Sequence, residues 1–449
     1  MVEKFGPVRV GLLGVGTVGT GTLDVLTGNA AEITRRAGRH IEITHAVARN
    51  LDRARERLAG RAELVADPMS IVNNPDIDIV VELIGGEERA YELVMAAIAN
   101  GKHVVTANKA LLALRGNEIF AAASAQGVMV AFEAAVAGGI PIIKALREGL
   151  SANRIESIAG IINGTTNYIL SEMREHGSSF ADVLKAAQEL GFAEADPTFD
   201  IEGVDAAHKL ALIAAIAFGV PVQFDRCHIE GINGLDGRDI EFAEKLGYRI
   251  KLLALARSRR GSADGSDLKP GIELRVHPTL IPERRLLANV EGPMNAIWVR
   301  GDAVGETLYY GQGAGAKPTA SAVVADLIDV ARTLTADPDH RVPHLAFQPD
   351  SLADSPILPM GETETAYYLR LLVTDEPGVL ADITRFLADA GISLESVLQP
   401  APQTADSNTT IILLTHRTVE RQMDAAVSRI QALATVRGPV VRLRLEDLT

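Results

Sequence analysis

The sequence predicts an α/β protein with three parts: a doubly wound parallel sheet, an α+β domain and a small ferredoxin-like βαββαβ domain. Its 449 residues are too many for one hydrophobic core. Short apolar segments alternate with helical patterns over residues 1–135, which is typical of a parallel sheet covered by helices. Residues 365–449 show the order strand, helix, strand, strand, helix, strand. These observations divide the chain before any motif is considered.

Residues 1–135 are expected to form a Rossmann-type dinucleotide-binding domain. VRVGLLG (8–14) and IEITHAVA (41–48) are predicted to be the first two strands, and DIDIVVELIG (76–85) and KHVVTAN (102–108) contain the next two. The amphipathic segment ERAYELVMAAIAN (88–100) predicts a helix between the last pair. Strands that are apolar on both faces indicate a sheet buried between two layers of helices.

Residues 136–335 are expected to form an α+β catalytic and dimerisation domain, because long helical patterns are followed by strand-like segments. RRGSADGSDLK (259–269) is predicted to be an exposed hairpin or loop. The segment 311–335 is a candidate to complete the first domain. The expected helices cover 167–176, 180–190, 204–218 and 319–334, and the expected strands cover 248–256 and 271–278.

A Pro-, Asp- and His-rich stretch at 336–364 is predicted to be a linker, and residues 365–449 a separate small domain. The small domain would form a ferredoxin-like sandwich. Its expected strands lie in YYLRLLV (367–373), ISLESVLQ (392–399), TTIILLTH (409–416) and VVRLRLE (440–446), and its expected helices cover 378–390 and 419–433.

Charge and cysteine content exclude several classes of protein. With 44 basic and 58 acidic side chains the formal charge is −14, which argues against nucleic acid or an anionic membrane as a partner. The single cysteine, Cys227, excludes an intrachain disulfide and a multi-cysteine metal site. Without an apolar targeting segment or a span of transmembrane length, the protein is expected to be cytoplasmic.

A complete G-x-G-x-x-G motif follows the first predicted strand and begins a helix. The first glycine would permit a tight turn, the second would let a pyrophosphate approach the backbone, and the third would allow close helix–sheet packing. The start of the helix would supply amide donors and partial positive charge to the phosphates. The predicted cofactor-binding residues of this motif are Gly14, Gly16, Thr17, Val18 and Gly19.

The end of the second strand indicates which dinucleotide binds. NAD-specific sites usually place an acidic residue there, whereas this chain has Arg49, whose guanidinium suits the 2′-phosphate of NADP. NADP is therefore favoured, although the nearby Asp52 leaves NAD as an alternative. A second glycine cluster, GQGAGAKPTAS (311–321), is either another turn that faces the cofactor or a tight turn into the following helix.

Two lysines are the candidates for the proton transfer that a nicotinamide enzyme needs. Lys109 follows the fourth strand, at the carboxyl edge where doubly wound sheets bind ligands. Lys209 lies four residues after Asp205 on an otherwise apolar helix, so the two can form a charge-assisted pair. A surface ion pair is the alternative, but a buried lysine is costly unless it is paired. His208 points to a different helix face from its neighbour Lys209.

Six separated motifs together resemble homoserine dehydrogenase, in order, from about residue 8 to residue 334. They are GLLGVGTVG, VVTANKALLA, FEAAVAGGIPI, INGTTNYIL, LGFAEADPTFDIEGVDAAHKLALIA and GQGAGAKPTASA. The resemblance implies reversible, NAD(P)-dependent interconversion of L-homoserine and L-aspartate 4-semialdehyde, which feeds threonine and methionine synthesis. It is to the monofunctional form rather than to the fusion with aspartate kinase.

The resemblance also implies roles for individual residues. Lys209 matches the catalytic lysine, and Lys109 matches a second lysine near both nicotinamide and substrate. The acidic residues that hold homoserine correspond to Glu194 and Asp205, and further cofactor contacts correspond to Gly191 and to Gly313 or Gly315. A monovalent-cation site, described as a sodium site in the family, would use the Glu133 carboxylate and the carbonyls of Val136, Gly138 and Ile140.

The segment VTDEPGVLADITRFLADAGISLESVLQ (373–399) resembles an ACT domain, a regulatory module that often binds amino acids. The resemblance implies feedback control, with L-threonine as the leading candidate effector. ACT units commonly pair through their sheets, so a homodimer or homotetramer is expected. A dimerising module without a ligand is the alternative.

Two other functions are weighed against a homoserine dehydrogenase. Oxidation of aspartate semialdehyde through a thioester needs an activated cysteine, and Cys227 has no evident activating neighbours in QFDRCHIEGI. A non-catalytic sensor of amino acid and nucleotide could share the fold. A sensor has no need of the proton-transfer residues Lys109 and Lys209, so their presence favours the enzyme.

Overall fold

The structure is a computed structural model that describes residues 6–259, 269–400 and 408–448. It divides into two compact units. The first unit contains Met1–Gly164, Val204–Cys227 and Pro293–Ser355, and the second contains Thr165–Gly203, His228–Gly292 and Pro356–Thr449. Most of the loop expected at 259–269 lies outside the described residues.

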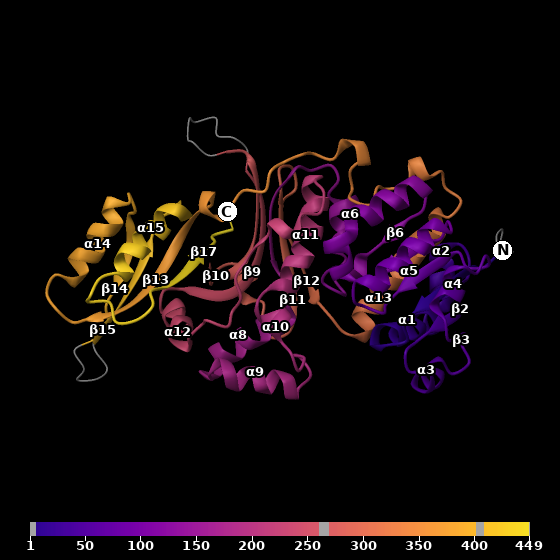
Figure 1. The fold of residues 1–449 in the computed structure, drawn as a ribbon, viewed down its shortest axis with the longest axis horizontal. Helices are drawn as coiled ribbons and strands as arrows, with labels where there is room; N and C mark the ends of the chain where they lie inside the picture. Colours follow the sequence, from indigo (N-terminus) through magenta and orange to yellow (C-terminus); the bar gives the residue numbers. More distant parts are fainter. Residues whose placement is uncertain (1–5, 260–268, 401–407, 449) are drawn as a thin grey trace. The chain divides into compact units, whose positions relative to one another are not determined.

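The first unit contains a six-stranded parallel sheet in the order β3-β2-β1-β4-β5-β6 (Figure 1). Chain order reverses at β1, so the sheet is doubly wound, as expected from the alternation in the sequence. β1 pairs with β2 from Val8↔Ile41 onward and with β4 from Val10↔Ile79 onward. The strands are β1 (Val8–Leu13), β2 (Ile41–Val47), β3 (Glu63–Val65), β4 (Ile79–Glu82), β5 (His103–Thr106) and β6 (Val130–Ala131).

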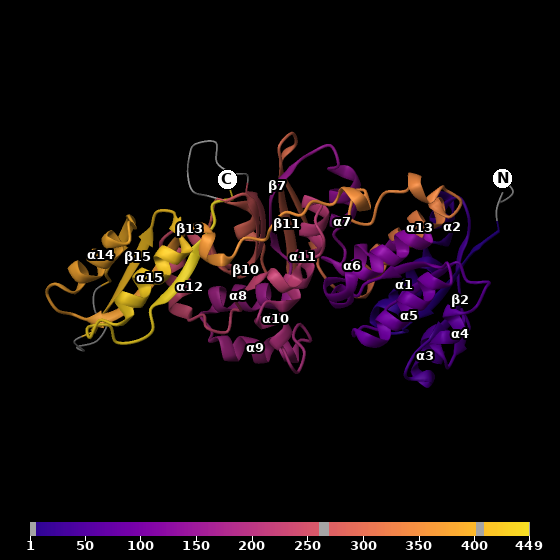
Figure 2. The same cartoon turned by 45° about the horizontal axis from the view of Figure 1, so that its top comes forward.

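Three of the helices that follow these strands, α3, α4 and α6, begin at polar capping residues. The side chain of Asn50 caps α3, that of Asp67 caps α4, and that of Asn108 caps α6 by accepting a hydrogen bond from a backbone N–H. The helices are α1 (Thr17–Gly28), α2 (Ala30–Ala37), α3 (Leu51–Leu58), α4 (Pro68–Val72), α5 (Glu88–Ala99) and α6 (Lys109–Gln126), seen from a second side in Figure 2.

A helix from much later in the chain belongs to the same core. α13 (Ala316–Thr333) packs Val323, Leu327 and Val330 into one hydrophobic cluster with strands β1, β2 and β4. Gly21 of α1 permits this, because a Cβ at that position would lie 2.6 Å from the carbonyl oxygen of Ala316. The dinucleotide-binding core is therefore assembled from two distant segments.

The remainder of the first unit surrounds this sheet. β12, β11 and β7 are antiparallel neighbours, and the buried helix α11 lies near them in both views (Figures 1 and 2). The segment expected to be a linker is partly buried: His344 accepts a hydrogen bond from Val130 N at 3.0 Å. The elements are η1 (Glu133–Ala135), α7 (Ile142–Lys144), η2 (Ala145–Gly149), β7 (Ile155–Ile161), α11 (Val204–Phe218), η3 (Phe224–Arg226), β11 (Met294–Gly301), β12 (Gly305–Gln312), η5 (Pro338–His340) and η6 (Pro349–Ser351).

The second unit combines helices with a long hairpin. β9 (Tyr248–Arg259) and β10 (Gly271–Pro282) pair antiparallel along their whole length, from Tyr248↔Pro282 to Arg259↔Gly271. Short β8 (His228–Ile229) runs parallel to β10. The other elements here are α8 (Gly164–His176), α9 (Phe180–Glu189), α10 (Thr198–Ile201), α12 (Gly237–Lys245), η4 (Leu286–Asn289) and η7 (Met360–Glu362).

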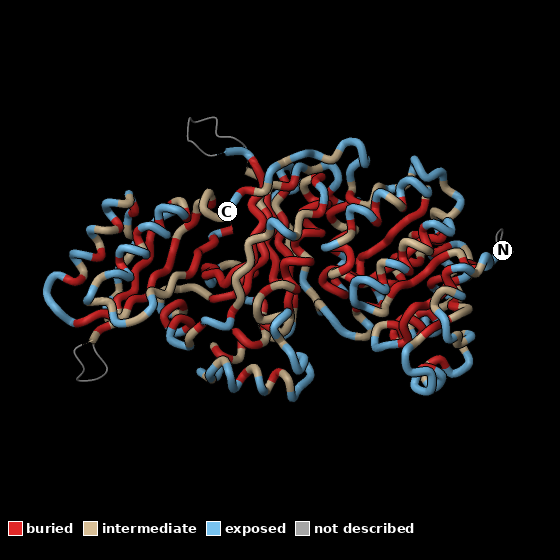
Figure 3. Tube along the Cα trace, viewed as in Figure 1, coloured by how far each residue is buried: buried red, intermediate tan, exposed pale blue. Residues whose placement is uncertain are grey.

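The carboxyl-terminal part of the second unit is the expected βαββαβ sandwich. Its sheet has the order β17-β13-β15-β14, and its two helices bury Ile383, Leu387, Met423 and Ile430 against the strands. Figure 3 shows the central strands β13 and β15 largely buried and the outer helix faces exposed, whereas the edge strand β14 has no buried residue. The elements are β13 (Glu364–Thr374), α14 (Val379–Asp389), β14 (Leu394–Leu398), β15 (Asn408–Thr415), β16 (Thr418–Val419), α15 (Glu420–Gln431) and β17 (Val441–Leu445). In the described part of the chain, no helix is both long and apolar enough to span a membrane.

Candidate active site

The first unit brings Lys109, Asp205 and Lys209 together. Asp205 and Lys209 are one turn apart on α11, and Lys209 Nζ lies 2.6 Å from Asp205 Oδ2. Lys109, the first residue of α6, places its Nζ 3.1 Å from Asp205 Oδ1. The Asp205 carboxylate thus joins two lysines that are a hundred residues apart in the chain.

Burial distinguishes this cluster from a surface ion pair. The side chains of Asp205 and Lys209 are 5% and 12% exposed, and that of Lys109 is 33% exposed. Burial alone would raise the pKa of Asp205, but the ammonium groups of Lys209 and Lys109 hold it well below its usual range. Asp205 is therefore a carboxylate at neutral pH and keeps its attraction for both lysines.

Two groups that sequence reasoning did not identify complete the surroundings of Lys209. Lys209 Nζ also donates a hydrogen bond to the carbonyl of Ile162 at 2.7 Å, and Asn163 Nδ2 donates to Asp205 Oδ2 at 2.8 Å. Both residues follow directly after strand β7. A polar Asn-Gly pair after an apolar strand was the available signal. Ile162 therefore holds the Lys209 ammonium directly, and Asn163 holds the carboxylate that pairs with it.

A hydrogen-bond network at the carboxyl ends of β4 and β5 positions Lys109. Thr106 donates to the buried Glu82 carboxylate at 2.6 Å, and Asn108 N donates to Thr106 Oγ1 at 3.0 Å. Asn108 Nδ2 donates to the carbonyl of Gly86, while its Oδ1 caps α6 by accepting from Leu111 N. These bonds set the first turn of α6, and with it the direction of the Lys109 side chain.

The glycines of the G-x-G-x-x-G motif have the geometry that the motif requires. Gly14 has φ of +110°, and a Cβ there would lie 2.6 Å from the carbonyl oxygen of Leu83. A Cβ on Gly19 would lie 2.1 Å from the carbonyl oxygen of Gly14, so this glycine permits helix and strand to approach. Around Gly16, directly before Thr17 and Val18 of α1, a Cβ would meet open space. The backbone is therefore accessible where a pyrophosphate would approach.

A groove of about 840 Å³ runs over this turn. Its lining includes Gly14, Gly16, the end of β2, and the glycines 85 and 86 after β4. Arg49 and Arg53 line the same groove, whereas Asp52 is 95% exposed and pairs with Arg55. Its volume is in the range of cofactor sites, and cationic groups lie where the second strand ends.

Packing and backbone conformation account for the second glycine cluster. A Cβ on Gly313 would lie 2.0 Å from Asn295 Nδ2, and Gly315 has φ of +124° directly before α13. Gly313 also accommodates Gly138, whose Cβ would lie 2.4 Å from the Gly313 carbonyl oxygen. The contact of Gly313 or Gly315 with the cofactor stays a prediction.

The predicted cation ligands lie in one short segment of the first unit. Glu133 is 2% exposed, and its two carboxylate oxygens accept hydrogen bonds from Ile143 N and Lys144 N, each at 2.9 Å. Ala137 and Gly138 both have positive φ, so the chain turns sharply between Val136 and Ile140. Burial raises the pKa of Glu133, and a bound cation would oppose that effect. A buried carboxylate beside backbone carbonyls fits a hard cation in chemical type.

Glu194 and Gly191 lie in the second unit, in the loop between α9 and α10. Gly191 follows the end of α9 with φ of +77°, and the Glu194 carbonyl accepts a hydrogen bond from Gln188 Nε2 at 3.1 Å. Both residues are exposed. Their predicted contacts with substrate and cofactor remain predictions.

Cys227 and His208 have unreactive surroundings. Burial raises the pKa of the Cys227 thiol to about 12, so it is a thiol at neutral pH. Burial lowers the pKa of His208 to about 4, and its ring packs edge-on against Phe224. Neither residue is poised for the proton transfer at neutral pH, which agrees with the choice of lysine.

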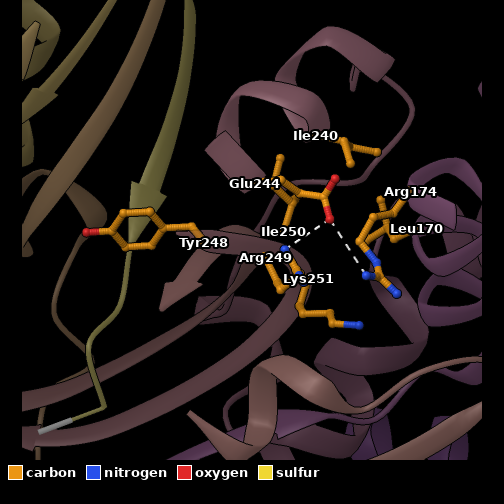
Figure 4. A pocket seen from close by; sticks show the side chains of 8 residues that line it. All are labelled: Leu170, Arg174, Ile240, Glu244, Tyr248, Arg249, Ile250 and Lys251. Carbon is orange, nitrogen blue, oxygen red and sulfur yellow. Dashed lines mark ion pairs between the residues drawn. The ribbon is translucent and has the colours of Figure 1, made fainter. Parts of the chain in front are cut away.

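A separate small cavity lies in the second unit, between α8, α12 and β9 (Figure 4). Its volume is about 10 Å³, close to the space that one water molecule needs. Glu244 forms ion pairs with Arg249 at 3.0 Å and with Arg174 at 3.7 Å along its wall. Lys251 donates a hydrogen bond to the carbonyl of Val290 at 2.6 Å. The cavity is too small for a substrate, so we interpret these contacts as structural.

Three family models match the chain. The model described as "Homoserine dehydrogenase, NAD binding domain" matches residues 14–133, and "Homoserine dehydrogenase" matches residues 141–328. The model described as "ACT domain" matches residues 367–435. The matches follow one another in the order of the parallel sheet, the segment that contains α11 and the βαββαβ sandwich.

Known proteins resemble the chain over its full length. It is 58% identical to a homoserine dehydrogenase from Pseudomonas aeruginosa, covering 98% of this chain and 99% of that protein. A crystal structure of a homoserine dehydrogenase from Thiobacillus denitrificans has 65% identity and a TM-score of 0.93, covering 99% of each chain. A hyperthermophilic archaeal homoserine dehydrogenase in complex with NADPH has 26% identity and a TM-score of 0.60, covering 73% of this chain and 98% of that one.

Proposed function

This chain belongs to the homoserine dehydrogenase family of NAD(P)-dependent oxidoreductases, and on that premise we propose that Lys209 carries the proton to and from the substrate oxygen. In the reducing direction L-aspartate 4-semialdehyde becomes L-homoserine. A reduced nicotinamide, when bound, would supply the hydride for the aldehyde carbon, and Lys209 Nζ would give the proton to the oxygen of the same carbonyl. The observation that carries this proposal is the Lys209 ammonium, on a side chain only 12% exposed, held by Asp205 and the carbonyl of Ile162.

Asp205 acts mainly by holding the donor in place. One of its oxygens contacts Lys209 and the other contacts Lys109, so both ammonium groups share one anion. A proton donor fixed in this way needs no reorganisation when charge develops on the substrate oxygen. We assign Lys109 to the same substrate oxygen or to the nicotinamide-facing side of the substrate, because it is the more exposed of the two lysines.

The substrate's own ammonium group needs an anionic partner, and we assign this role to Glu194, with Asp205 as a second acidic contact. The exposed carboxylate of Glu194 lies in a loop of the second unit. An exposed side chain is available to a ligand, and the family resemblance selects Glu194 from the acidic residues of that loop.

We propose NADP as the preferred dinucleotide. The pyrophosphate would lie on the turn formed by Gly14, Gly16 and Gly19, and the guanidinium of Arg49 would pair with the 2′-phosphate. Thr17 and Val18 place their backbone N–H groups at the start of α1. Gly191 and Gly313 or Gly315 are the further proposed cofactor contacts.

A monovalent cation, sodium by our proposal, would be held by the Glu133 carboxylate and the carbonyl oxygens of Val136, Gly138 and Ile140. Its chemistry there would be to neutralise a buried carboxylate and to stabilise the turn between η1 and α7. Support comes from the burial of Glu133 and from the consecutive positive φ values at Ala137 and Gly138.

The ACT domain binds a regulatory amino acid, and we propose that this amino acid is L-threonine. ACT sandwiches commonly assemble through their sheets, and a homodimer or homotetramer is proposed here for the same reason. β14 is the edge strand of this sheet, with Val397 45% exposed on it.

The test is the absorbance of reduced nicotinamide after L-homoserine is mixed with NADP⁺ or NAD⁺, with and without L-threonine. Lys209→Met should lower kcat by about 10²- to 10⁴-fold and leave the Kd for NADP⁺ unchanged. Lys251→Met is the control for loss of a buried lysine, since Lys251 belongs to the second unit and Lys209 to the first. Turnover by Lys209→Met at the wild-type rate would refute the assignment, and a folded wild type without turnover would favour a sensor.

A further inference from the structure

Strand β17 belongs to two parts of the second unit at once. It pairs antiparallel with β13 of the ACT sandwich, from Ala366↔Leu445 to Arg370↔Val441. On its other side it pairs parallel with β10, at Thr279↔Arg444 and Leu280↔Leu445. A side chain on β17 can therefore contact the ACT helices and the loops beside β10 at the same time.

Arg444 of β17 contacts two carboxylates from different parts of the unit. Its guanidinium donates two hydrogen bonds to Glu230 at 2.7 and 2.9 Å, and two to Glu420 at 2.9 and 2.5 Å. Glu420 is the first residue of ACT helix α15, and Glu230 follows β8. Arg444 is 2% exposed, so water competes little for these bonds. The guanidinium is shared between the ACT domain and the segment after β8.

Glu230 stays charged in this setting. Burial alone would raise its pKa, but the hydrogen bonds from His228 and Arg444 hold the pKa of Glu230 well below its usual range. Its backbone N–H is also fixed, since it donates to the carbonyl of Val276 on β10. The position of residue 230 is therefore set by Arg444 from one side and by β10 from another.

The residues after Glu230 hold the end of α10. Ile232 N donates a hydrogen bond to the carbonyl of Ile201 at 2.8 Å, and Asn233 Nδ2 donates to Glu202 Oε1 at 2.6 Å. A Cβ on Gly231 would lie 2.4 Å from the carbonyl oxygen of Ile201, so the two backbones touch. Displacement of residues 230–233 must therefore displace residues 201 and 202.

These held residues directly precede the catalytic helix in the chain. Gly203 is followed by Val204, the first residue of α11, and Asp205 comes next. At the start of the loop between α9 and α10, the Thr165 hydroxyl donates a hydrogen bond to the carbonyl of Phe192 at 2.7 Å. The loop that carries Glu194 is thus anchored at both ends, and one anchor depends on Glu230.

We propose that the Arg444–Glu230 ion pair positions the 201–203 junction, and through it the substrate-binding residues on either side, under the control of the ACT domain. Both residues act through others, so they are positioning residues. The proposal rests on the function proposed above for Glu194 and Asp205. A shift of α15 when the ACT domain binds its amino acid would change how Arg444 is shared between Glu420 and Glu230.

Glu230→Gln removes the charge and keeps the shape, and Asp239→Asn is the matched control. Asp239 is buried, whereas the Glu230 side chain is 38% exposed beside its buried partner Arg444. Asp239 joins α12 to Arg370 of ACT strand β13 with hydrogen bonds of 2.5 and 2.9 Å. Both variants remove one carboxylate that pairs with an ACT arginine. Arg444→Lys is the second test variant, since it keeps the charge and loses the paired geometry.

Hydrogen exchange of the full chain is measured first, followed by steady-state kinetics. Glu230→Gln should exchange faster than wild type in peptides covering 198–205 and 229–233, and Asp239→Asn should not. The KM for L-homoserine should rise between about 2- and 30-fold in Glu230→Gln while the KM for NADP⁺ stays within about twofold. Inhibition by L-threonine should weaken in the same variant, with Arg444→Lys intermediate.

Equal behaviour of Glu230→Gln and Asp239→Asn, in exchange or in the KM for L-homoserine, would overturn the proposal. So would faster exchange without a change in that KM. If the wild type shows no turnover, the proposed function fails instead, and the exchange comparison alone then decides whether the ion pair holds the junction.

Discussion

Asp205→Asn tests whether the charge of this side chain, rather than its shape, holds the two lysines. Three donors converge on its two oxygens: Lys109 on Oδ1 at 3.1 Å, and Lys209 and Asn163 on Oδ2 at 2.6 and 2.8 Å. An amide offers one accepting oxygen and one donating NH₂ group. In the variant, the remaining oxygen of residue 205 still accepts hydrogen bonds. The new NH₂ group replaces the other oxygen and points a donor at the donors that contacted it, either Lys109 or the pair Lys209 and Asn163.

The cost follows from leaving an ammonium group without its anion. Removal of one partner from a buried ion pair costs about 3 to 5 kcal/mol. The Lys109 side chain is 33% exposed and can turn into water. We therefore expect a loss near the lower end, about 3 kcal/mol in the free energy of unfolding, or a Tm lower by roughly 6 to 12 °C. Displacement of Lys209 by even 1 Å should lower kcat/KM by about 100-fold.

The pH dependence has a defined sign. The pKa of Asp205 in the folded protein lies below its ordinary value of 3.8, since Lys209 and Lys109 outweigh the effect of burial. Its stabilising contribution is therefore fully present above about pH 4 and is lost as the pH falls toward the lowered pKa. The difference in Tm between wild type and Asp205→Asn should be largest near neutral pH and should shrink below about pH 4.

Thermal unfolding from pH 7 down to pH 3, together with initial rates at pH 7, measures both effects. Asp239→Asn again serves as control, because it removes a buried carboxylate from Arg370 and should lower Tm without lowering kcat/KM by a comparable factor. A Tm for Asp205→Asn that equals the wild-type value, or unchanged kcat/KM, would refute the reasoning. A Tm difference that grows below pH 4 would show that its sign is wrong.

Two further expectations concern the cofactor and the cation. Arg49→Ala should raise the KM for NADP⁺ by about 10- to 100-fold and leave the KM for NAD⁺ unchanged, because only NADP carries the 2′-phosphate; equal effects in initial-rate assays would count against it. In wild type, sodium chloride should raise Tm above its value in choline chloride at equal ionic strength, and Glu133→Gln should abolish that difference; a sodium effect that persists in the variant would exclude Glu133 as a ligand.

Local sequence signals predicted most of the fold, because each depends on neighbouring residues. The G-x-G-x-x-G turn, the apolar parallel strands and the periodic helices of the final domain all have such signals, and the structure contains them. The Asp205–Lys209 pair could equally be predicted from the sequence, since a spacing of four residues places two side chains on one helix face. The comparisons confirm the family and the overall fold class.

Other features depend on contacts between distant residues, which no local pattern contains. Lys109 contacts Asp205 across almost a hundred positions of sequence, and Asn163 reaches the same carboxylate from the end of another strand. The Arg444–Glu230 pair joins residues 214 positions apart. The 336–364 segment was expected to be a linker, but Leu345 is buried and His344 accepts a hydrogen bond from Val130 N, so part of the segment packs against β6. The polar composition of a segment indicates that it can be exposed to water, but it does not show which residues the segment packs against.

Helix α13 belongs to the dinucleotide-binding fold but is translated long after the strands that it covers. The last strand of the parallel sheet, β6, ends at Ala131, but the helix that covers Val10, Ile43 and Val81 with Leu327 and Val330 ends only at Thr333. At typical rates of translation these two points leave the ribosome roughly 10 to 40 s apart. During that interval the apolar face that α13 covers together with α1 and α2 lacks part of its cover, so the amino-terminal domain completes its folding only after most of the catalytic domain has been made.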